Sequence, residues 1–230
     1  TADHVVQTEL AADLPVLVRT LLYPNKDFAH YRVVKGYDDA TREFIQDDSF
    51  EGGNRRFSYD DFSQIWKPFN YGYLVLVPPE KQALIEAILG KETDPLVAWK
   101  NAAQTARWEL EVDPADTLAQ FNLAVALYYL GEREQSATAF EKVEARLPLR
   151  TLWYQIEPIQ NYFDLGNYAR VFSLSNKIFN DNNRAFSELY LLRGKSYLAQ
   201  GDTVLARAEL EKAVLYNKNS KPAREALNSL

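Results

Sequence analysis

The stretches Leu123-Ala-Val-Ala-Leu-Tyr-Tyr-Leu-Gly131 and Gly194-Lys-Ser-Tyr-Leu-Ala-Gln-Gly201 decide the fold of the C-terminal half of this 230-residue chain. Each contains small residues and ends in a glycine, and the first of them is an apolar run. Gly166 lies midway between the two final glycines, since 166 − 131 and 201 − 166 both equal 35. A glycine can end a helix in a left-handed conformation at low energetic cost. This recurrence therefore predicts three successive helical hairpins over residues 117–230.

The residues around these glycines resemble the tetratricopeptide repeat family, whose period is about 34 residues. The matching positions of the first copy are Leu123, Ala124, Leu127, Ser136, Phe140 and Pro148. Those of the third copy are Gly194, Tyr197, Ala206, Leu210 and Ala213, and the degenerate middle copy keeps Tyr162, Gly166, Tyr168 and Ile178. The resemblance implies an all-α superhelix, and the alternative is a set of unrelated hairpins with coincident spacing.

Close packing explains the residue types of the repeat pattern. Small residues at Ala124, Gly194 and Ala206 let antiparallel helices approach, while Phe140 and Leu210 fill the space between hairpins. Asp202 follows Gly201 and is the expected N-cap of the next helix. Residues 221–230 are expected to form a final capping helix.

Residues 1–80 show a different pattern, which predicts an α+β unit with an antiparallel sheet. Apolar or alternating runs predict strands at residues 14–22, 28–39, 43–47 and 71–77, the second of which breaks at Gly36. Gly52-Gly53-Asn54 predicts a flexible loop, and Ser58 is the expected N-cap of a short helix with Phe62, Ile65 and Trp66 on its apolar face. With so few elements, this unit is not expected to be a whole domain.

Residues 81–116 predict a helical connector. Two amphipathic patterns, at residues 81–89 and 95–111, come before Asp113-Pro114 and are consistent with a degenerate repeat. The predicted organisation is therefore residues 1–80, the connector 81–116 and the repeats 117–230.

The composition excludes several classes of function. The net charge is −6, and the sequence has no basic stripe of the kind that nucleic-acid binding requires. No apolar run is long enough to span a bilayer. The sequence has no Cys, which rules out a disulfide or a thiol nucleophile within these residues, and two His (His4 and His30) make a multi-histidine metal centre implausible. We expect no metal and no cofactor. The absence of Met suggests a fragment or a processed product.

The run His30-Tyr-Arg-Val-Val-Lys-Gly-Tyr-Asp-Asp39, followed by Ile45-Gln-Asp47 and by Arg56-Phe-Ser-Tyr-Asp-Asp-Phe62, carries a second resemblance. It resembles the C-terminal half of the bacteriocin-processing (double-glycine leader) cysteine peptidase-like family, which has a papain-like fold. The resemblance implies that His30 is the general base to a cysteine and that Asp47 is the carboxylate that orients its imidazole.

The family pattern and this sequence differ at two points. Asp48 stands where the family usually has Pro, which leaves open whether Asp47 or Asp48 is the partner of His30. The nucleophile and the oxyanion-hole donor of the family precede the His half, on a segment that these residues do not include. The alternative is that His30 and a distant Asp only pack or decorate the surface.

The repeat family usually binds peptides along the first helix of each hairpin. The corresponding positions, which are largely aromatic or apolar, are Phe121, Val125, Tyr128, Trp153, Ile156, Gln160, Glu188, Leu191 and Lys195. We expect such a groove to hold an apolar protein or peptide segment. That segment could equally belong to this chain, either to residues 80–112 or to the α+β unit.

These observations favour a protein- or peptide-binding repeat module attached to a peptidase-like domain without its nucleophile. One alternative is a cysteine peptidase whose Cys-bearing N-terminal segment is a separate or removed fragment, which would then be a partner of this chain. Another is a pseudo-enzyme that only binds peptides. Catalysis by these residues alone is not expected. The location is unknown, although relatives of the peptidase-like family favour a bacterial extracytoplasmic or membrane-associated site.

Overall fold

A computed structural model describes residues 2–230, with side chains from Val6 onward. The side chain of His4, for which we predict no role, lies outside the described part. The chain divides into two compact units, one of residues 1–131 and 139–151 and the other of residues 132–138 and 152–230. The predicted domain boundaries at residues 80 and 116 remain a prediction.

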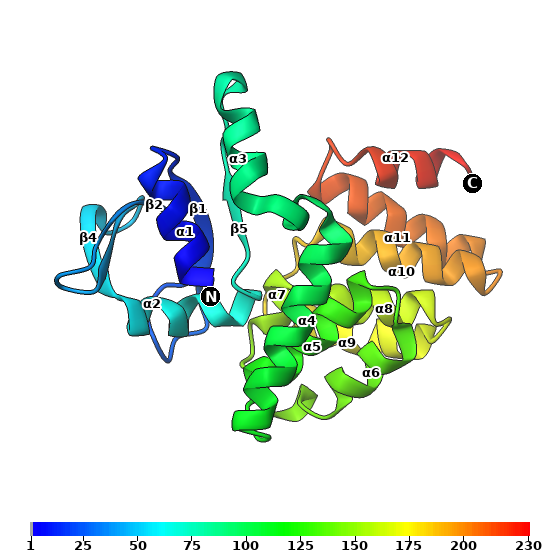
Figure 1. Ribbon diagram of the computed structural model, residues 1–230. Coiled ribbons are helices and arrows are strands. Elements are labelled where there is room, and N and C mark those ends of the chain that lie inside the picture. The colour runs from blue at the N-terminus through cyan, green and yellow to red at the C-terminus, as the bar shows by residue number, and fades with distance from the viewer. Residues whose placement is uncertain (1) are drawn as a thin grey trace. The chain divides into compact units, whose positions relative to one another are not determined.

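The N-terminal part is an α+β fold built on one antiparallel sheet, as predicted (Figure 1). Its elements are α1 (Ala2–Ala11), β1 (Val16–Leu21), β2 (Ala29–Asp38), β3 (Glu43–Asp48), β4 (Gly52–Ser58), α2 (Tyr59–Trp66), the 3₁₀ helix η1 (Lys67–Phe69) and β5 (Tyr73–Val75). The strands lie in the order β4-β3-β2-β1-β5, and all pairings are antiparallel.

One face of the sheet is buried under α1 and α2. Every second residue of β1 and β3 is buried, and Val16, Val18, Val34 and Phe44 join one apolar core with Val6 and Leu10 of α1 and with Phe62, Ile65 and Trp66 of α2. This two-residue alternation is the pattern of a strand that packs on a single face. Ser58 caps α2 by accepting a hydrogen bond from the Asp61 N–H, as predicted.

Three features of this part differ from the sequence prediction. Gly52-Gly53-Asn54 was expected as a loop, which is wrong, because these residues begin the edge strand β4. The second strand does not end at Gly36 but continues to Asp38 past a bulge between Val34 and Gly36. The helix α1 was not predicted.

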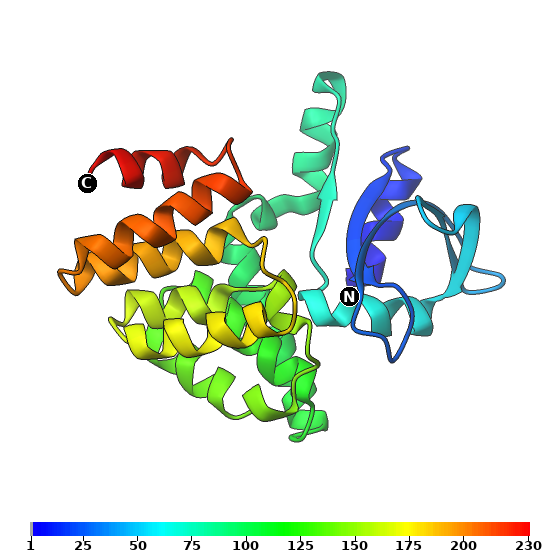
Figure 2. The same ribbon diagram turned by 180° about the vertical axis from the view of Figure 1, so that it is seen from behind.

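The rest of the chain is helical, which confirms the predicted fold class. The elements are η2 (Pro79–Lys81), α3 (Gln82–Leu89), η3 (Gly90–Thr93), α4 (Pro95–Val112), α5 (Thr117–Tyr129), α6 (Arg133–Glu141), η4 (Glu144–Arg146), α7 (Thr151–Tyr154), α8 (Glu157–Asp164), α9 (Tyr168–Asn180), α10 (Ser187–Ala199), α11 (Thr203–Tyr216) and α12 (Lys221–Asn228). The paired helices α10 and α11 lie side by side in both views (Figures 1 and 2).

The hairpin turns follow the predicted chemistry. Gly131, Gly166 and Gly201 have positive φ angles of 79°, 71° and 83°, the region that glycine adopts without strain. Asp202 caps α11 by accepting from the Leu205 N–H. A Cβ atom at Gly194 would lie 2.7 Å from Leu210, so this position of α10 requires glycine for the close approach of α11.

Within residues 2–230 no helix combines the length and the apolar character needed to cross a membrane.

Candidate functional site

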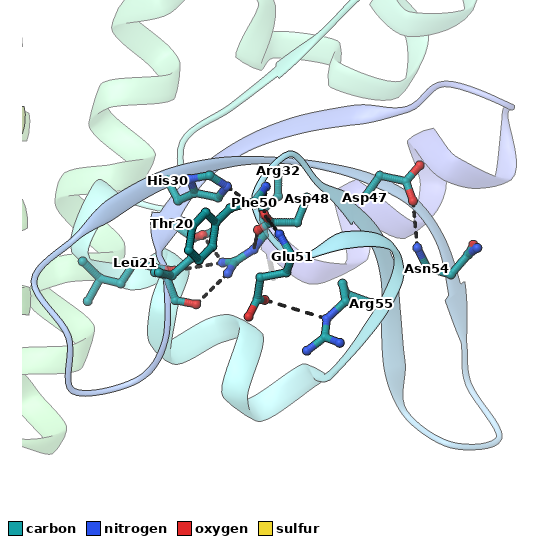
Figure 3. Close-up of polar contacts among 11 residues, drawn as sticks. Thr20, Leu21, His30, Arg32, Asp47, Asp48, Phe50, Glu51, Asn54 and Arg55 are labelled. Carbon is teal, nitrogen blue, oxygen red and sulfur yellow. Dashed lines mark hydrogen bonds and ion pairs between the residues drawn. The ribbon is translucent and has the colours of Figure 1, made fainter.

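The strand alternation of the sheet places His30, Arg32 and Asp48 together. His30 and Arg32 lie two residues apart on β2, so their side chains point to the same face, and Arg32 is directly opposite Asp48 of β3. On the other side, His30 is opposite Thr20 of β1. Figure 3 shows the imidazole and the guanidinium converging on the carboxylate of Asp48.

The Asp48 carboxylate is fully engaged. Its Oδ1 lies 3.0 Å from His30 Nε2 and accepts from the backbone N–H groups of Phe50 (2.7 Å) and Glu51 (2.8 Å). Its Oδ2 accepts from Arg32 Nε at 2.9 Å. Burial acts to raise the pKa of Asp48, but the N–H groups of Glu51 and Phe50 and the contact with His30 outweigh it and hold this pKa below its ordinary value. Asp48 is therefore a fixed anion.

Arg32 is buried completely and is held at four of its donors. Besides Asp48, it donates from Nη1 to the Thr20 hydroxyl (2.6 Å) and the Leu21 carbonyl (2.9 Å), and from Nη2 to the Leu22 carbonyl (2.6 Å). Its guanidinium also lies over the Phe57 ring, 5.0 Å from the centroid. Burial lowers the pKa of Arg32, and the hydrogen bond and charge of Asp48 oppose that shift.

The structure does not bring His30 and Asp47 together. Asp47 is the next residue along β3 from Asp48, so it points to the opposite face, where its Oδ1 pairs with Lys35 Nζ at 2.7 Å and accepts from the Asn54 N–H at 2.8 Å. The hydrogen bond of Lys35 and that of the Asn54 N–H lower the pKa of Asp47. Of the two aspartates left open by the sequence, Asp48 is the one in contact with His30.

The geometry fixes what the imidazole can do. An ionised carboxylate only accepts hydrogen bonds, so the ring nitrogen that faces Asp48 carries a proton, and in a neutral ring Nδ1 is then the basic nitrogen. The His30 side chain is 22% exposed, whereas that of Asp48 is completely buried. An oriented, partly exposed imidazole on a buried carboxylate can act as a general base. The 230 residues contain no Cys for it to activate.

In the first repeat, two predicted groove residues are buried in the chain itself. Phe121 and Val125 of α5 are 0% and 1% exposed, and the Phe121 ring packs against Phe140. Tyr128 is half-buried. The Asn122 amide donates to the Lys67 carbonyl at 2.7 Å, and Lys67 Nζ lies 2.6 Å from Asp116 Oδ2, both within the first compact unit. A segment of this chain thus contacts the first helix of the first repeat.

In the other repeats the predicted positions are distributed less regularly. Trp153 belongs to α7, Ile156 precedes α8 and Gln160 lies within α8, so the three do not share one helix. In α10, Leu191 packs against the buried cluster of Tyr190, Ala213 and Ala223, whereas Glu188 and Lys195 are exposed. Within α10, the predicted positions therefore divide between two exposed side chains and one that contributes to packing.

Sequence reasoning overlooked Arg32 and Thr20. The signal was available in the alternation itself, since His30, Arg32 and Val34 occupy every second position of one strand. A charged residue between a candidate base and an apolar core position faces inward and needs an opposite charge. Among the described residues no group of three or more His, Cys, Asp or Glu side chains is arranged to hold a metal ion.

The chain thus combines an α+β domain that carries the His30–Asp48 pair with helical hairpins that follow it. Residues 2–74 match the family described as Peptidase_C39 like family, and residues 118–148 match the tetratricopeptide repeat family. Both predicted resemblances and their order along the chain are thereby confirmed. A search of the curated proteins found no match.

Proposed function

We propose that this chain is a protein- or peptide-binding protein whose repeats recruit the ligand and whose peptidase-like domain lacks a nucleophile among these residues. The observation that carries the proposal is the combination of an assembled His30–Asp48 pair with the absence of Cys from all 230 residues. Tetratricopeptide repeats are a binding architecture, and the partly exposed Trp153 and Leu191 favour an extended apolar segment as the ligand.

The binding test uses the full chain and short labelled peptides. Peptides rich in leucine and phenylalanine are compared with glycine–serine peptides of equal length by fluorescence anisotropy. We expect saturable binding of the apolar peptides, weakened by Trp153→Ala and by Leu191→Ala but not by Asp47→Ala on the sheet. Equal anisotropy for both peptide classes, or identical binding by all variants, would refute the proposal.

The second candidate function is that of a cysteine peptidase, and the contact between His30 and Asp48 favours it. The roles would be His30 as the base and Asp48 as the orienting carboxylate, with the thiol supplied by a Cys-bearing segment outside these residues. Native mass spectrometry followed by denaturing mass spectrometry of the purified material tests this. A bound second polypeptide that contains Cys, together with peptide hydrolysis lost in His30→Ala, supports the peptidase. Hydrolysis that is unchanged in His30→Ala eliminates these roles.

A further inference from the structure

The completely buried guanidinium of Arg32 shares a carboxylate with His30, yet it points away from solvent and cannot reach a ligand directly. Oδ1 of Asp48 serves His30, and Oδ2 serves Arg32. The guanidinium and the imidazole therefore share one buried anion. The protonation state of the imidazole depends on which of the two side chains balances the charge of Asp48.

We propose that Arg32 is a positioning residue for His30, which neutralises Asp48 so that the imidazole stays neutral and keeps Nδ1 free to accept a proton. This inference deepens the proposed role of His30 as a base and rests on it. The function assigned to Arg32 is to neutralise the charge of Asp48, which the hydrogen bond between a neutral His30 and Asp48 does not do.

Charge balance is the first reason. Removing a carboxylate from water is costly unless an opposite charge and hydrogen bonds compensate it. Two backbone N–H groups, neither of which belongs to Arg32, also donate to Asp48 and favour its anion. Without the guanidinium, the imidazole would become the ion-pair partner of Asp48, and its protonated form would be favoured. A protonated ring has no lone pair left and cannot act as a base.

Rigidity is the second reason. The guanidinium is fixed to the end of β1 by the Thr20 hydroxyl and by the carbonyls of Leu21 and Leu22. Because its Nε bond to Asp48 is part of the same planar fork, the carboxylate is held in one orientation relative to β1 and β2. The direction of the His30 ring follows from that orientation.

The other charged groups around the site have partners of their own. Glu51, in the turn after β3, lies 3.8 Å from Arg55 of β4. Asp27, in the segment before β2, lies 2.6 Å from Arg150. Lys35 and Asp47 pair on the opposite face of the sheet. Arg32 is thus the cation whose removal acts directly on the Asp48–His30 contact.

The test is ring-nitrogen NMR of the full chain, which contains two histidines, with His4→Gln used to assign the His30 signals. At a fixed pH of about 7, we expect Arg32→Gln to raise the ratio of imidazolium to imidazole at His30 by about tenfold or more. Arg32→Lys keeps the charge and is expected to stay close to the wild-type ratio. Arg193→Gln, which removes a buried arginine from the repeats, is the matched control and should leave His30 unchanged.

A wild-type ratio in a folded Arg32→Gln variant overturns the proposal. If Arg32→Gln does not fold, Arg32→Lys decides, because a tenfold rise in that charge-preserving variant would overturn charge balance as the mechanism. The readout is the protonation state of a ring and requires neither peptide binding nor hydrolysis. Failure of the proposed function would therefore leave this result readable, and the two failures are distinguishable.

Discussion

The sheet and the helical repeats each bury an arginine beside a carboxylate, and the two pairs are built alike. In the sheet, Arg32 Nε lies 2.9 Å from Asp48, and the guanidinium covers Phe57. In the repeats, Arg193 Nε lies 2.8 Å from Glu209, and the guanidinium covers Phe172 and Phe179. Each arginine also donates to a hydroxyl, that of Thr20 in the first case and that of Ser175 in the second.

The difference lies in what else the carboxylate holds. Asp48 accepts from two backbone N–H groups and from His30, a titratable ring that is 22% exposed. Glu209 instead has Lys212 as a further partner, at 3.4 Å and about half exposed, on the same helix. A buried ion pair alone is therefore a packing device, and it becomes part of a candidate site where it ends on an exposed group with chemistry of its own.

The largest effect is expected for Asp48→Ala. This change leaves Arg32 buried without a countercharge and removes the acceptor of two backbone N–H groups. We expect a loss of about 3–5 kcal/mol in the unfolding free energy of the sheet. Hydrogen exchange followed by mass spectrometry on residues 43–58 reports on this region separately from the repeats. Unchanged protection from exchange in these residues would mean that Asp48 does not stabilise the sheet.

Replacing both partners separates the two pairs more sharply. Arg193→Met with Glu209→Leu is expected to stay within about 1 kcal/mol of the wild type, since apolar side chains of similar size often replace a buried pair at no cost. Arg32→Met with Asp48→Leu is expected to cost about 2–4 kcal/mol, because the N–H groups of Phe50 and Glu51 and the carbonyls of Leu21 and Leu22 lose their partners.

Urea unfolding of the two double variants measures this difference. Tyrosine and tryptophan signals from both units overlap, so the hydrogen exchange of peptides from each unit assigns the transitions. Equal losses in both units would show that the additional partners of Asp48 contribute nothing beyond the ion pair.

A third prediction concerns Glu9, a buried carboxyl of α1 for which the described residues provide no arginine partner. Burial raises the pKa of Glu9 to about 7, and the Tyr73 hydroxyl offsets this only in part. Because the folded state holds this proton more tightly than the unfolded chain, the contribution of Glu9 to stability is highest below about pH 4 and falls as the pH rises toward 7. We expect this group to account for about 1–3 kcal/mol of that fall.

Thermal unfolding across this pH range tests the prediction by comparing the wild type with Glu9→Gln. The variant should lose the part of the pH dependence that Glu9 contributes. Superimposable pH profiles would contradict a raised pKa at Glu9.

The repeats were largely predictable because each decisive residue satisfies a local requirement. Gly131, Gly166 and Gly201 adopt positive φ, Asp202 accepts from a helix N–H, and Gly194 has no room for a Cβ. Such requirements depend on a residue and its immediate neighbours, so the sequence displays them. The predicted groove depends instead on what covers each helix, and the burial of Phe121 and Val125 was not visible in the sequence.

The site in the sheet was predictable only in part, because it depends on strand phase. The run Phe44-Ile-Gln-Asp-Asp48 has apolar residues at two adjacent positions, so alternation alone does not decide whether Asp47 or Asp48 faces inward. The burial of Phe44 and Gln46 sets that phase in the structure. Strand β4 was missed because it begins with Gly-Gly-Asn, residues that strands usually avoid.

The smallest effect is expected for Asp47→Ala, the neighbour and matched control of Asp48→Ala. Asp47 is 45% exposed, and the water around its pair with Lys35 screens the attraction. The Asn54 N–H that it accepts from lies at an exposed strand edge, where water can replace it. Unfolding and the His30 ring signals should both be indistinguishable from the wild type. If Asp47→Ala shifted the His30 signals while Asp48→Asn left them in place, the partner assignment would be reversed. Asp47 would then be the carboxylate that acts on His30, and Asp48 would contribute only to packing.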